Sequence, residues 1–316
     1  MPKASPSIGS SILESIGRTP LVQLNKVVPK QSARVLVKLE YFNPTGSYKD
    51  RSALSMIELA EARGDLRPGM KVVERTAGST GSSLALICSV KGYLFAAVTI
   101  DTASKEKLDT MRLFGAELDV MHVPDGKMTP EFLQQMTDRV EALVNYGNAY
   151  YTGQISNPDN PKGYASIGHE LLEQAGGKID AFCAAVGTAG MLVGVSRVLK
   201  QAHPSTQVIA LEPLTSPVVS QQRVGPHGVE GIAFTANLPL LERSDYDQVL
   251  GIDETEAARM TVRLAREEGV FSGTSSGMNV VGALRLAQTL GTGHTVATVA
   301  CDSGLKYLSA GAFDLR

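Results

Sequence analysis

A lysine at the start of a predicted helix, Lys49, is a candidate reactive residue of this chain. The segment Asn43-Pro-Thr-Gly-Ser-Tyr-Lys49-Asp-Arg51 forms a turn that opens the predicted helix Asp50–Arg63. A cation is unfavourable there, because the exposed N–H groups of a helix start already carry partial positive charge. Two interpretations stay open. Lys49 is either a solvated side chain compensated by Asp50, or an amine kept neutral so that it acts as a nucleophile or forms a Schiff base with a carbonyl.

Other loops rich in Gly, Ser and Thr follow predicted strands or precede predicted helices. Thr76–Gly81 presents N–H groups and hydroxyls suited to a carboxylate or a phosphate, although ordinary helix capping explains this loop equally well on its own. Gly187–Gly194 follows an apolar strand and opens a helix, which is the arrangement of a phosphate cradle. Gly273–Gly277 opens another helix, and Cys301–Gly304 follows the last predicted strand. Together with Lys49, these loops indicate a site for a phosphorylated, carbonyl-bearing ligand.

The phosphate is predicted to be a monophosphate. The loop that begins at Gly187 matches neither the dinucleotide pattern G-x-G-x-x-G nor the P-loop pattern G-x-x-x-x-G-K-[S/T]. No acidic residue stands at the distance from this loop that would hold a ribose. A nicotinamide-dependent dehydrogenase is therefore a disfavoured alternative.

The elements that must position these loops alternate along nearly the whole chain. Short β-branched runs alternate with amphipathic stretches at the spacing of βα units, which predicts an α/β fold with covered sheets. Gly64 is predicted to end the first helix, and Pro213–Gly231 to form a long loop. The predicted strands are Val35–Leu39, Lys71–Glu74, Phe95–Ile100, Glu117–Val123, Ile179–Val186, Gln207–Leu211 and Thr295–Ala300. The predicted helices are Asp50–Arg63, Gly81–Lys91, Ser104–Phe114, Thr129–Asn145, Pro161–Ala175, Met191–Gln201, Thr255–Glu268 and Ser276–Leu290.

Composition excludes several classes of protein. The 316 residues favour two lobes, each with its own core. With 30 basic and 32 acidic residues and no long run of either sign, a nucleic-acid partner is not expected. The longest apolar stretch, 179–195, is broken by Asp180 and several glycines, so no membrane helix is expected. The N-terminus lacks an apolar signal region, and Cys88, Cys183 and Cys301 are widely spaced, which predicts a reducing, cytoplasmic compartment.

Taken in order along the chain, these motifs resemble those of the cysteine synthase and cystathionine β-synthase family, pyridoxal-phosphate-dependent enzymes of fold type II. The matching stretches run from Ile16–Val22 to Asp302–Ser309, so the resemblance covers essentially the whole chain. It implies a tryptophan-synthase-β-like architecture of two lobes, each an open, mostly parallel, twisted sheet flanked by helices. The implied smaller lobe is residues 41–150, and the larger lobe combines residues 1–40 and 151–316.

The resemblance also implies roles for individual residues. Lys49 is implied to form the Schiff base with pyridoxal 5′-phosphate, and Ser275 to face the pyridine nitrogen of the cofactor. No metal ion is implied. The other implied cofactor contacts are Ser79, Gly187, Thr188, Ala189, Gly190, Met191 and Asp302. The implied substrate contacts are Thr76, Ala77, Gly78, Ser79, Thr80, Gln154 and Gly231, the last from the loop Gly225–Ile232 at the entrance.

The reaction implied by the resemblance is a β-replacement on an activated L-serine. O-acetylserine or O-phosphoserine would react with sulfide or another nucleophile through an α-aminoacrylate, and the product would be L-cysteine or a cysteine-like amino acid. A homodimer is also implied. Arg223 is a candidate contact for a phosphate leaving group, although a solvated arginine is the simpler interpretation.

The chain departs from the family pattern in the substrate loop. The family usually has Thr-Ser-Gly-Asn-Thr-Gly where this chain has Thr76-Ala-Gly-Ser-Thr-Gly81. Ala77 removes a hydroxyl donor, and Ser79 is shorter than the asparagine that contacts the phenolic oxygen of the cofactor. Cys301 stands in place of a common proline and is interpreted as a buried structural thiol. Four alternatives therefore stay open: β-elimination of the cysteine desulfhydrase or serine dehydratase type, cystathionine β-synthase activity, synthesis of a specialised amino acid, and a catalytically poor homologue with a binding or regulatory role.

Overall fold

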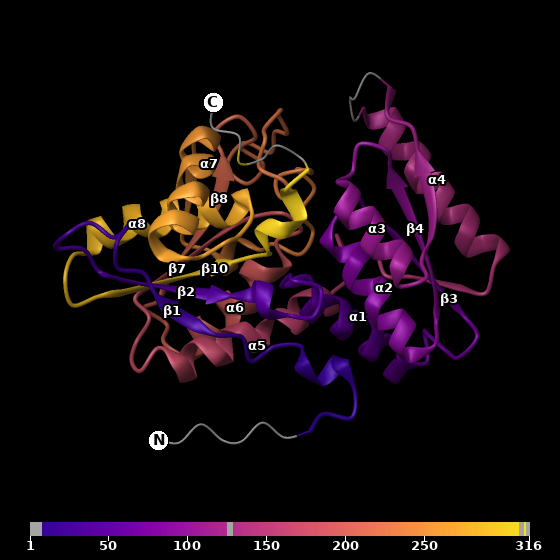
Figure 1. Ribbon diagram of the computed structural model, residues 1–316, viewed down its shortest axis with the longest axis horizontal. Coiled ribbons are helices and arrows are strands. Elements are labelled where there is room, and N and C mark those ends of the chain that lie inside the picture. Colours follow the sequence, from indigo (N-terminus) through magenta and orange to yellow (C-terminus); the bar gives the residue numbers. More distant parts are fainter. Residues whose placement is uncertain (1–7, 125–128, 310–312, 314–316) are drawn as a thin grey trace.

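Two sheets flanked by helices make up the protein (Figure 1). The computed structural model describes residues 8–124, 129–309 and 313. Within these residues, strands and helices alternate along the chain and nearly all neighbouring strands are parallel. The predicted α/β fold class is confirmed.

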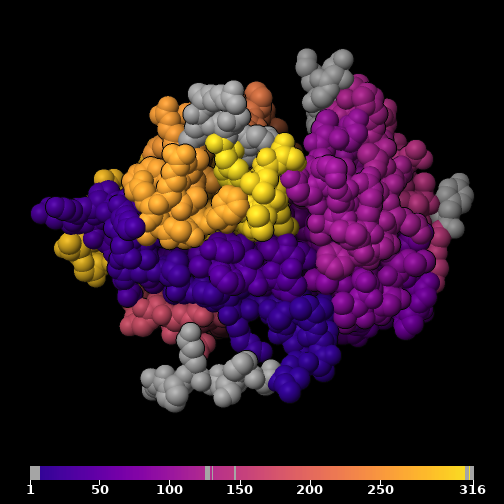
Figure 2. All heavy atoms as spheres, in the orientation of Figure 1, coloured from indigo at the N-terminus to yellow at the C-terminus, as the bar shows by residue number. Residues whose placement is uncertain are grey.

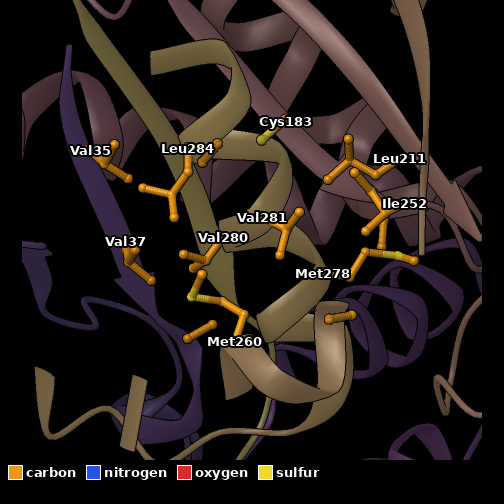
Figure 3. Close-up of a cluster of buried hydrophobic side chains, with 14 of the residues drawn as sticks. Val35, Val37, Cys183, Leu211, Ile252, Met260, Met278, Val280, Val281 and Leu284 are labelled. Atoms are coloured by element: carbon orange, nitrogen blue, oxygen red, sulfur yellow. The ribbon is translucent and has the colours of Figure 1, made fainter. Parts of the chain in front are cut away.

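The larger sheet has six strands in the order β1-β2-β10-β7-β8-β9. β1 is antiparallel to β2, and the other neighbours in this sheet are parallel. One face packs on α7 and α8 through the cluster drawn in Figure 3, in which Val35 and Val37 of β2 lie beside Leu284 and Val280 of α8. The other face packs on α5 and α6. The bounds are β1 Leu21–Gln23, β2 Arg34–Leu39, β7 Ala181–Ala185, β8 Gln207–Pro213, β9 Gln248–Ile252, β10 Thr295–Ala300, α5 Asp159–Gln174, α6 Gly190–Ala202, α7 Glu254–Arg263 and α8 Thr274–Leu290.

The smaller sheet has four parallel strands in the order β5-β4-β3-β6. α1, α2 and α3 cover one face and α4 covers the other. Of its central strands, β4 is almost entirely apolar and buried, and the three middle residues of β3 are buried, as expected for parallel strands covered on both faces. The bounds are β3 Lys71–Arg75, β4 Leu94–Ile100, β5 Glu117–Met121, β6 Ala149–Tyr151, α1 Lys49–Arg63, α2 Ser79–Lys91, α3 Lys105–Leu113 and α4 Pro130–Tyr146.

The predicted elements agree with the observed ones to within a few residues, but three strands were not predicted. β1 and β6 have three residues each, and β9 lies at an edge of the larger sheet and contains Gly251. Such short edge strands carry too little alternation to stand out in a sequence. Gly64 ends α1 with a φ of +78°, as predicted. The lobe bounds at residues 40 and 150 stay a prediction.

The start of α1 is held by a buried group of charges. Nε of Arg51 lies 2.7 Å from Oε2 of Glu40, and its Nη1 lies 2.6 Å from Oε1 of Glu170 on α5. Lys38 of β2 lies 2.6 Å from the other oxygen of Glu170. These ion pairs tie the first turn of α1, which carries Lys49, to both β2 and α5.

The segment after β10 joins the two sheets on one side of the molecule. Figure 2 shows this segment, in yellow, against the helices of the smaller sheet, in magenta. Nζ of Lys107 on α3 lies 4.4 Å from the centre of the Tyr307 ring and 2.6 Å from a carboxylate oxygen of Glu230. The hydroxyl of Ser309 donates to Glu106 at 2.7 Å. The last part of the chain therefore adds contacts between the elements of the larger sheet and those of the smaller sheet.

None of the helices described combines the length and the apolar composition needed to cross a membrane. In residues 8–124, 129–309 and 313, no three His, Cys, Asp or Glu side chains are grouped in a way that could hold a metal ion.

Candidate active site

Lys49 is the first residue of α1 and lies where the smaller sheet's helices meet the end of β10. The backbone N–H of Tyr48 donates to the carbonyl oxygen of Cys301 at 2.9 Å, and Ser47 forms a β-bridge with Asp302. Nζ of Lys49 lies 4.7 Å from the centre of the Tyr48 ring. Burial lowers the pKa of Lys49 to about 8, although Cys301, Asp302 and Glu74 act in the opposite direction. A larger fraction of this amine is therefore neutral near pH 7 than for a solvated lysine.

The loop from Gly187 to Met191 connects β7 to α6 and shares a pocket with Lys49. Ala189 adopts a φ of +67°, a left-handed conformation that residues with a side chain rarely take. It precedes the first residue of α6, whose N-terminal N–H groups have no partners within the helix. The loop thus turns a set of amide donors and the positive end of a helix toward the pocket that Lys49 lines.

Close packing explains the small residues of this loop. A Cβ atom on Gly190 would lie 2.3 Å from Oδ1 of Asn160, and one on Gly187 would lie 2.7 Å from the carbonyl oxygen of Gly231. Gly231 itself has a φ of +81°. The loop that contains Gly231 is therefore in direct contact with the Gly187 loop, so these two predicted contact regions lie together.

Ser275 and Asp302 lie at the ends of neighbouring elements of the larger sheet. Ser275 is the second residue of α8, and Asp302 follows β10; each is 5% exposed. Oδ2 of Asp302 accepts a hydrogen bond from the Tyr307 hydroxyl at 2.5 Å, whereas Oδ1 has no partner among the residues described. Burial raises the pKa of Asp302, with Lys306 and Tyr307 opposing the shift. Burial likewise raises the pKa of Cys301 to about 12, so its thiol stays neutral near pH 7.

The segment from Thr76 to Thr80 connects β3 to α2. Gly78 is the N-cap of α2, and the hydroxyl of Thr80 donates to Oε1 of Gln154 at 2.7 Å. Gln154 comes from the segment after β6, the neighbour of β3 in the smaller sheet. Two of the predicted substrate contacts are therefore joined directly.

Ser79 makes contacts that its sequence position did not predict. Its Oγ lies 3.3 Å from Nζ of Lys306 and 3.4 Å from Oδ2 of Asp302. Burial lowers the pKa of Lys306, and the nearby Asp302 and Asp50 carboxylates raise it. The start of α2 is thus joined to the segment after β10 by polar contacts.

Glu74 and Asn160 belong to the candidate site, but they were not predicted from the sequence. Both are about 1% exposed. Glu74 accepts from the Thr152 hydroxyl at 2.5 Å and from the backbone N–H of Gln154 at 3.1 Å. Asn160 donates through Nδ2 to the carbonyl oxygen of Gln154 at 2.5 Å and to Oγ1 of Thr188 at 3.3 Å. In the sequence, Glu74 could have been recognised only as a charged residue near the end of an otherwise apolar predicted strand.

Arg223 is exposed and is not among the described residues that line the pocket around Lys49. Because that lining does not include Ser275, Asp302 or Gln154 either, a contact of Arg223 with a leaving group stays a prediction. A broader, open groove lies elsewhere, between the segments around Gln23–Asn25 and Thr292–Thr295. That groove contains none of the predicted site residues.

Comparisons with known proteins agree with this arrangement. Residues 12–302 match the family model described as "Pyridoxal-phosphate dependent enzyme". A cysteine synthase of Staphylococcus aureus is 40% identical over 303 residues, which cover 95% of each chain. The crystal structure of an O-ureido-L-serine synthase superposes with a TM-score of 0.89 at 36% identity, covering 98% of this chain and 96% of that one. A cysteine synthase from Entamoeba histolytica superposes with a TM-score of 0.92 at 32% identity, covering 100% and 94% of the two chains.

The family match and the relatives cover nearly all of the residues that form the two sheets and the pocket. Identity of this level over this length is found between members of one family. The chain therefore belongs to the family of pyridoxal-phosphate-dependent enzymes, and pyridoxal phosphate is its cofactor.

Proposed function

We propose that this enzyme catalyses β-replacement on an activated L-serine, either O-acetylserine or O-phosphoserine, with sulfide or another nucleophile, and releases L-cysteine or a cysteine-like amino acid. One observation carries the proposal: the Lys49 amine, with its lowered pKa, lines the same pocket as the amide cradle from Gly187 to Met191. The similarity to a cysteine synthase and to an O-ureido-L-serine synthase supports the reaction type.

The residues present fit pyridoxal phosphate. The amide donors at the start of α6 suit its phosphate, which a helix N-terminus holds without any basic patch. Ser275 would offer a neutral hydroxyl to the pyridine nitrogen, and Ser79 and Asp302, which lie 3.4 Å apart, would supply further polar contacts to the cofactor. When bound, the cofactor serves as the electron sink for bond cleavage at the α-carbon of an amino acid.

Lys49 would act as the general base for the α-proton of the substrate. An amine can take a proton at Nζ only in its neutral form. With a pKa of about 8, roughly 10% of the amine is neutral at pH 7, against about 0.04% for an ordinary lysine. Burial of Lys49 thus increases the supply of the active form by more than two orders of magnitude.

The segment from Thr76 to Thr80, together with Gln154, would hold the α-carboxylate of the substrate. The Thr80 hydroxyl donates to Oε1 of Gln154, and this bond leaves the Nε2 donors of Gln154 available for a ligand. The start of α2 adds backbone N–H groups from Gly78 onward. Donors from two elements would therefore meet the same carboxylate and fix the direction of its Cα–H bond relative to Lys49.

We also propose that the chain works in the cytoplasm as a homodimer of two-lobed subunits, with lobe bounds near residues 40 and 150. The buried free thiols Cys88, Cys183 and Cys301 are compatible with a reducing compartment. The strands of the smaller sheet all fall between residues 71 and 151, which supports the lobe division. The homodimer rests on the family resemblance. Light scattering of the purified holoenzyme measures it directly.

The test is to incubate the holoenzyme with O-acetylserine, O-phosphoserine, serine or cysteine in turn, with and without sulfide, and to measure cysteine, pyruvate and sulfide. Cysteine that forms only when sulfide is present supports β-replacement. Pyruvate from the same substrates, at an equal or greater rate, would instead assign the enzyme to β-elimination. Lys49→Ala is expected to abolish both products, and Lys105→Ala, which removes an exposed lysine of α3, is the matched control.

A further inference from the structure

We propose that Asn160 is a positioning residue that couples two loops. One is the cofactor-phosphate loop, Gly187 to Met191, and the other is the substrate-carboxylate loop, which consists of Thr76 to Thr80 together with Gln154. This inference rests on the proposed function. It does not follow from the family resemblance, which assigned no role to this residue. It is based on the hydrogen bonds that join Thr188 to Asn160 and Asn160 to the backbone of Gln154, whose side chain in turn bonds to Thr80.

The connection between the two loops passes through a single carboxamide. Nδ2 of Asn160 donates to the carbonyl oxygen of Gln154 at 2.5 Å and to Oγ1 of Thr188 at 3.3 Å. Gln154 in turn accepts from the Thr80 hydroxyl at 2.7 Å. Thr80 belongs to α2 of the smaller sheet, whereas Thr188 follows β7 of the larger sheet. The carboxamide therefore connects the backbone at Gln154, which follows β6 of the smaller sheet, to the side chain of Thr188, which follows β7 of the larger sheet.

Asn160 is buried and its side chain is closely packed. It is the second residue of α5 and is 1% exposed. A Cβ atom on Gly190 would lie only 2.3 Å from Oδ1 of Asn160, so the first residue of α6 packs directly against the carboxamide. A shift of the side chain would displace the cradle from Gly187 to Met191 and the Gln154 backbone together.

The hydrogen-bond balance of Asn160 argues against a purely stabilising role. Oδ1 is buried and has no partner among the residues described, and an unpaired buried acceptor is costly. An aliphatic side chain of similar shape would avoid that cost. Such a side chain would lack the Nδ2 donors, and these donors form the two hydrogen bonds that join the loops.

Loosening one loop should therefore loosen the other. Without Asn160, each loop loses one hydrogen bond that holds it in its binding geometry. We expect Asn160→Leu to raise the dissociation constant for pyridoxal phosphate about fivefold to tenfold, and to raise the dissociation constant for an amino-acid ligand by a similar factor. The turnover number at saturating substrate should change less than either constant, because Lys49 is untouched.

The experiment measures both constants without relying on turnover. The apoprotein is titrated with pyridoxal phosphate and followed by cofactor fluorescence. The holoenzyme, at saturating cofactor, is then titrated with L-serine and L-cysteine and followed by the visible absorbance of the cofactor. Asn157→Leu is the matched control, since Asn157 lies in the same connection and its side chain bonds to Thr152, Asp159 and Tyr150 but to neither loop. It is expected to lower the melting temperature and leave both constants unchanged.

Each outcome decides the question. A rise in both constants with Asn160→Leu, and in neither with Asn157→Leu, supports the coupling. A rise in one constant alone, or a change in melting temperature alone, overturns it. If the leucine variant does not fold, Asn160→Asp, which has nearly the same shape but no Nδ2 donors, takes its place with the same expected pattern. Failure of the proposed reaction with normal ligand binding would leave this result intact, so the two failures are distinguishable.

Discussion

Glu74 makes the stability of this protein depend on pH, and replacing it tests the electrostatics of the candidate site. The carboxyl group is about 1% exposed at the end of β3. Burial raises its pKa from 4.5 to about 7, while hydrogen bonds from Thr152 and Gln154 act in the opposite direction. Near neutral pH the folded protein therefore holds a carboxyl group that is only partly ionised.

The sign and size of the effect follow from that shift. Because the pKa is higher in the folded state than in the unfolded state, Glu74 stabilises the fold fully below about pH 4.5, and this contribution is lost as the pH rises through about 7. The difference between the two pKa values corresponds to roughly 3 kcal/mol. About 2 kcal/mol of this is lost between pH 5.5 and pH 8.5.

Glu74→Gln keeps an oxygen that accepts from Thr152 and Gln154 but cannot ionise. Relative to the wild type, the free energy of unfolding of this variant should rise by about 2 kcal/mol between pH 5.5 and pH 8.5. In a chain of 316 residues that is about 3 °C in melting temperature. Scanning calorimetry of the holoenzyme with excess cofactor measures the difference at each pH.

The control for Glu74→Gln is the same substitution at an exposed glutamate. Glu141 lies exposed on α4, so Glu141→Gln should follow the wild type at both pH values. Parallel pH profiles for wild type and Glu74→Gln would refute the reasoning, because they would mean that the carboxyl group of Glu74 ionises equally easily in the folded and unfolded chains.

Three further substitutions probe other parts of the structure. Gly187→Ala would place a Cβ atom 2.7 Å from the carbonyl oxygen of Gly231 and should weaken pyridoxal phosphate binding about tenfold in a fluorescence titration; unchanged affinity would contradict the close packing of that loop. Arg51→Met would leave buried Glu40 without its cation and should cost about 3–5 kcal/mol in urea unfolding, with a loss below about 1 kcal/mol counting against the ion-pair assignment. Ser79→Asn should raise the ratio of cysteine to pyruvate when O-acetylserine and sulfide are supplied, and a constant ratio would make this departure from the family neutral.

The central elements of the fold could be predicted because their signals are local. β10 occupies the predicted residues Thr295–Ala300, and α1 ends at the predicted glycine, because β-branched runs and a left-handed glycine act within a few residues. The strands β1, β6 and β9 escaped prediction, since a short edge strand is defined by the neighbour it pairs with.

The same distinction separates the predicted site residues from the missed ones. Small residues before a helix mark a ligand loop within a single motif, so the loop at Gly187 and the lysine at position 49 stood out. Asn160 acts through Thr188, which lies 28 positions away in the sequence. Lys306 acts through Ser79, 227 positions away. No local pattern identifies such a partner, because the contact exists only after the chain has folded.

The strand order of the larger sheet has a consequence for biosynthesis. β2, at residues 34–39, pairs directly with β10, at residues 295–300, so the middle of this sheet joins segments from opposite parts of the sequence. By contrast, the smaller sheet is built from one continuous stretch, residues 71–151. A nascent chain can therefore complete the smaller sheet long before the ribosome has supplied β10. Until then β2 has an unpaired edge, and the loops that would bind the cofactor have no common framework. The cofactor should accordingly enter only after translation of the chain is almost finished.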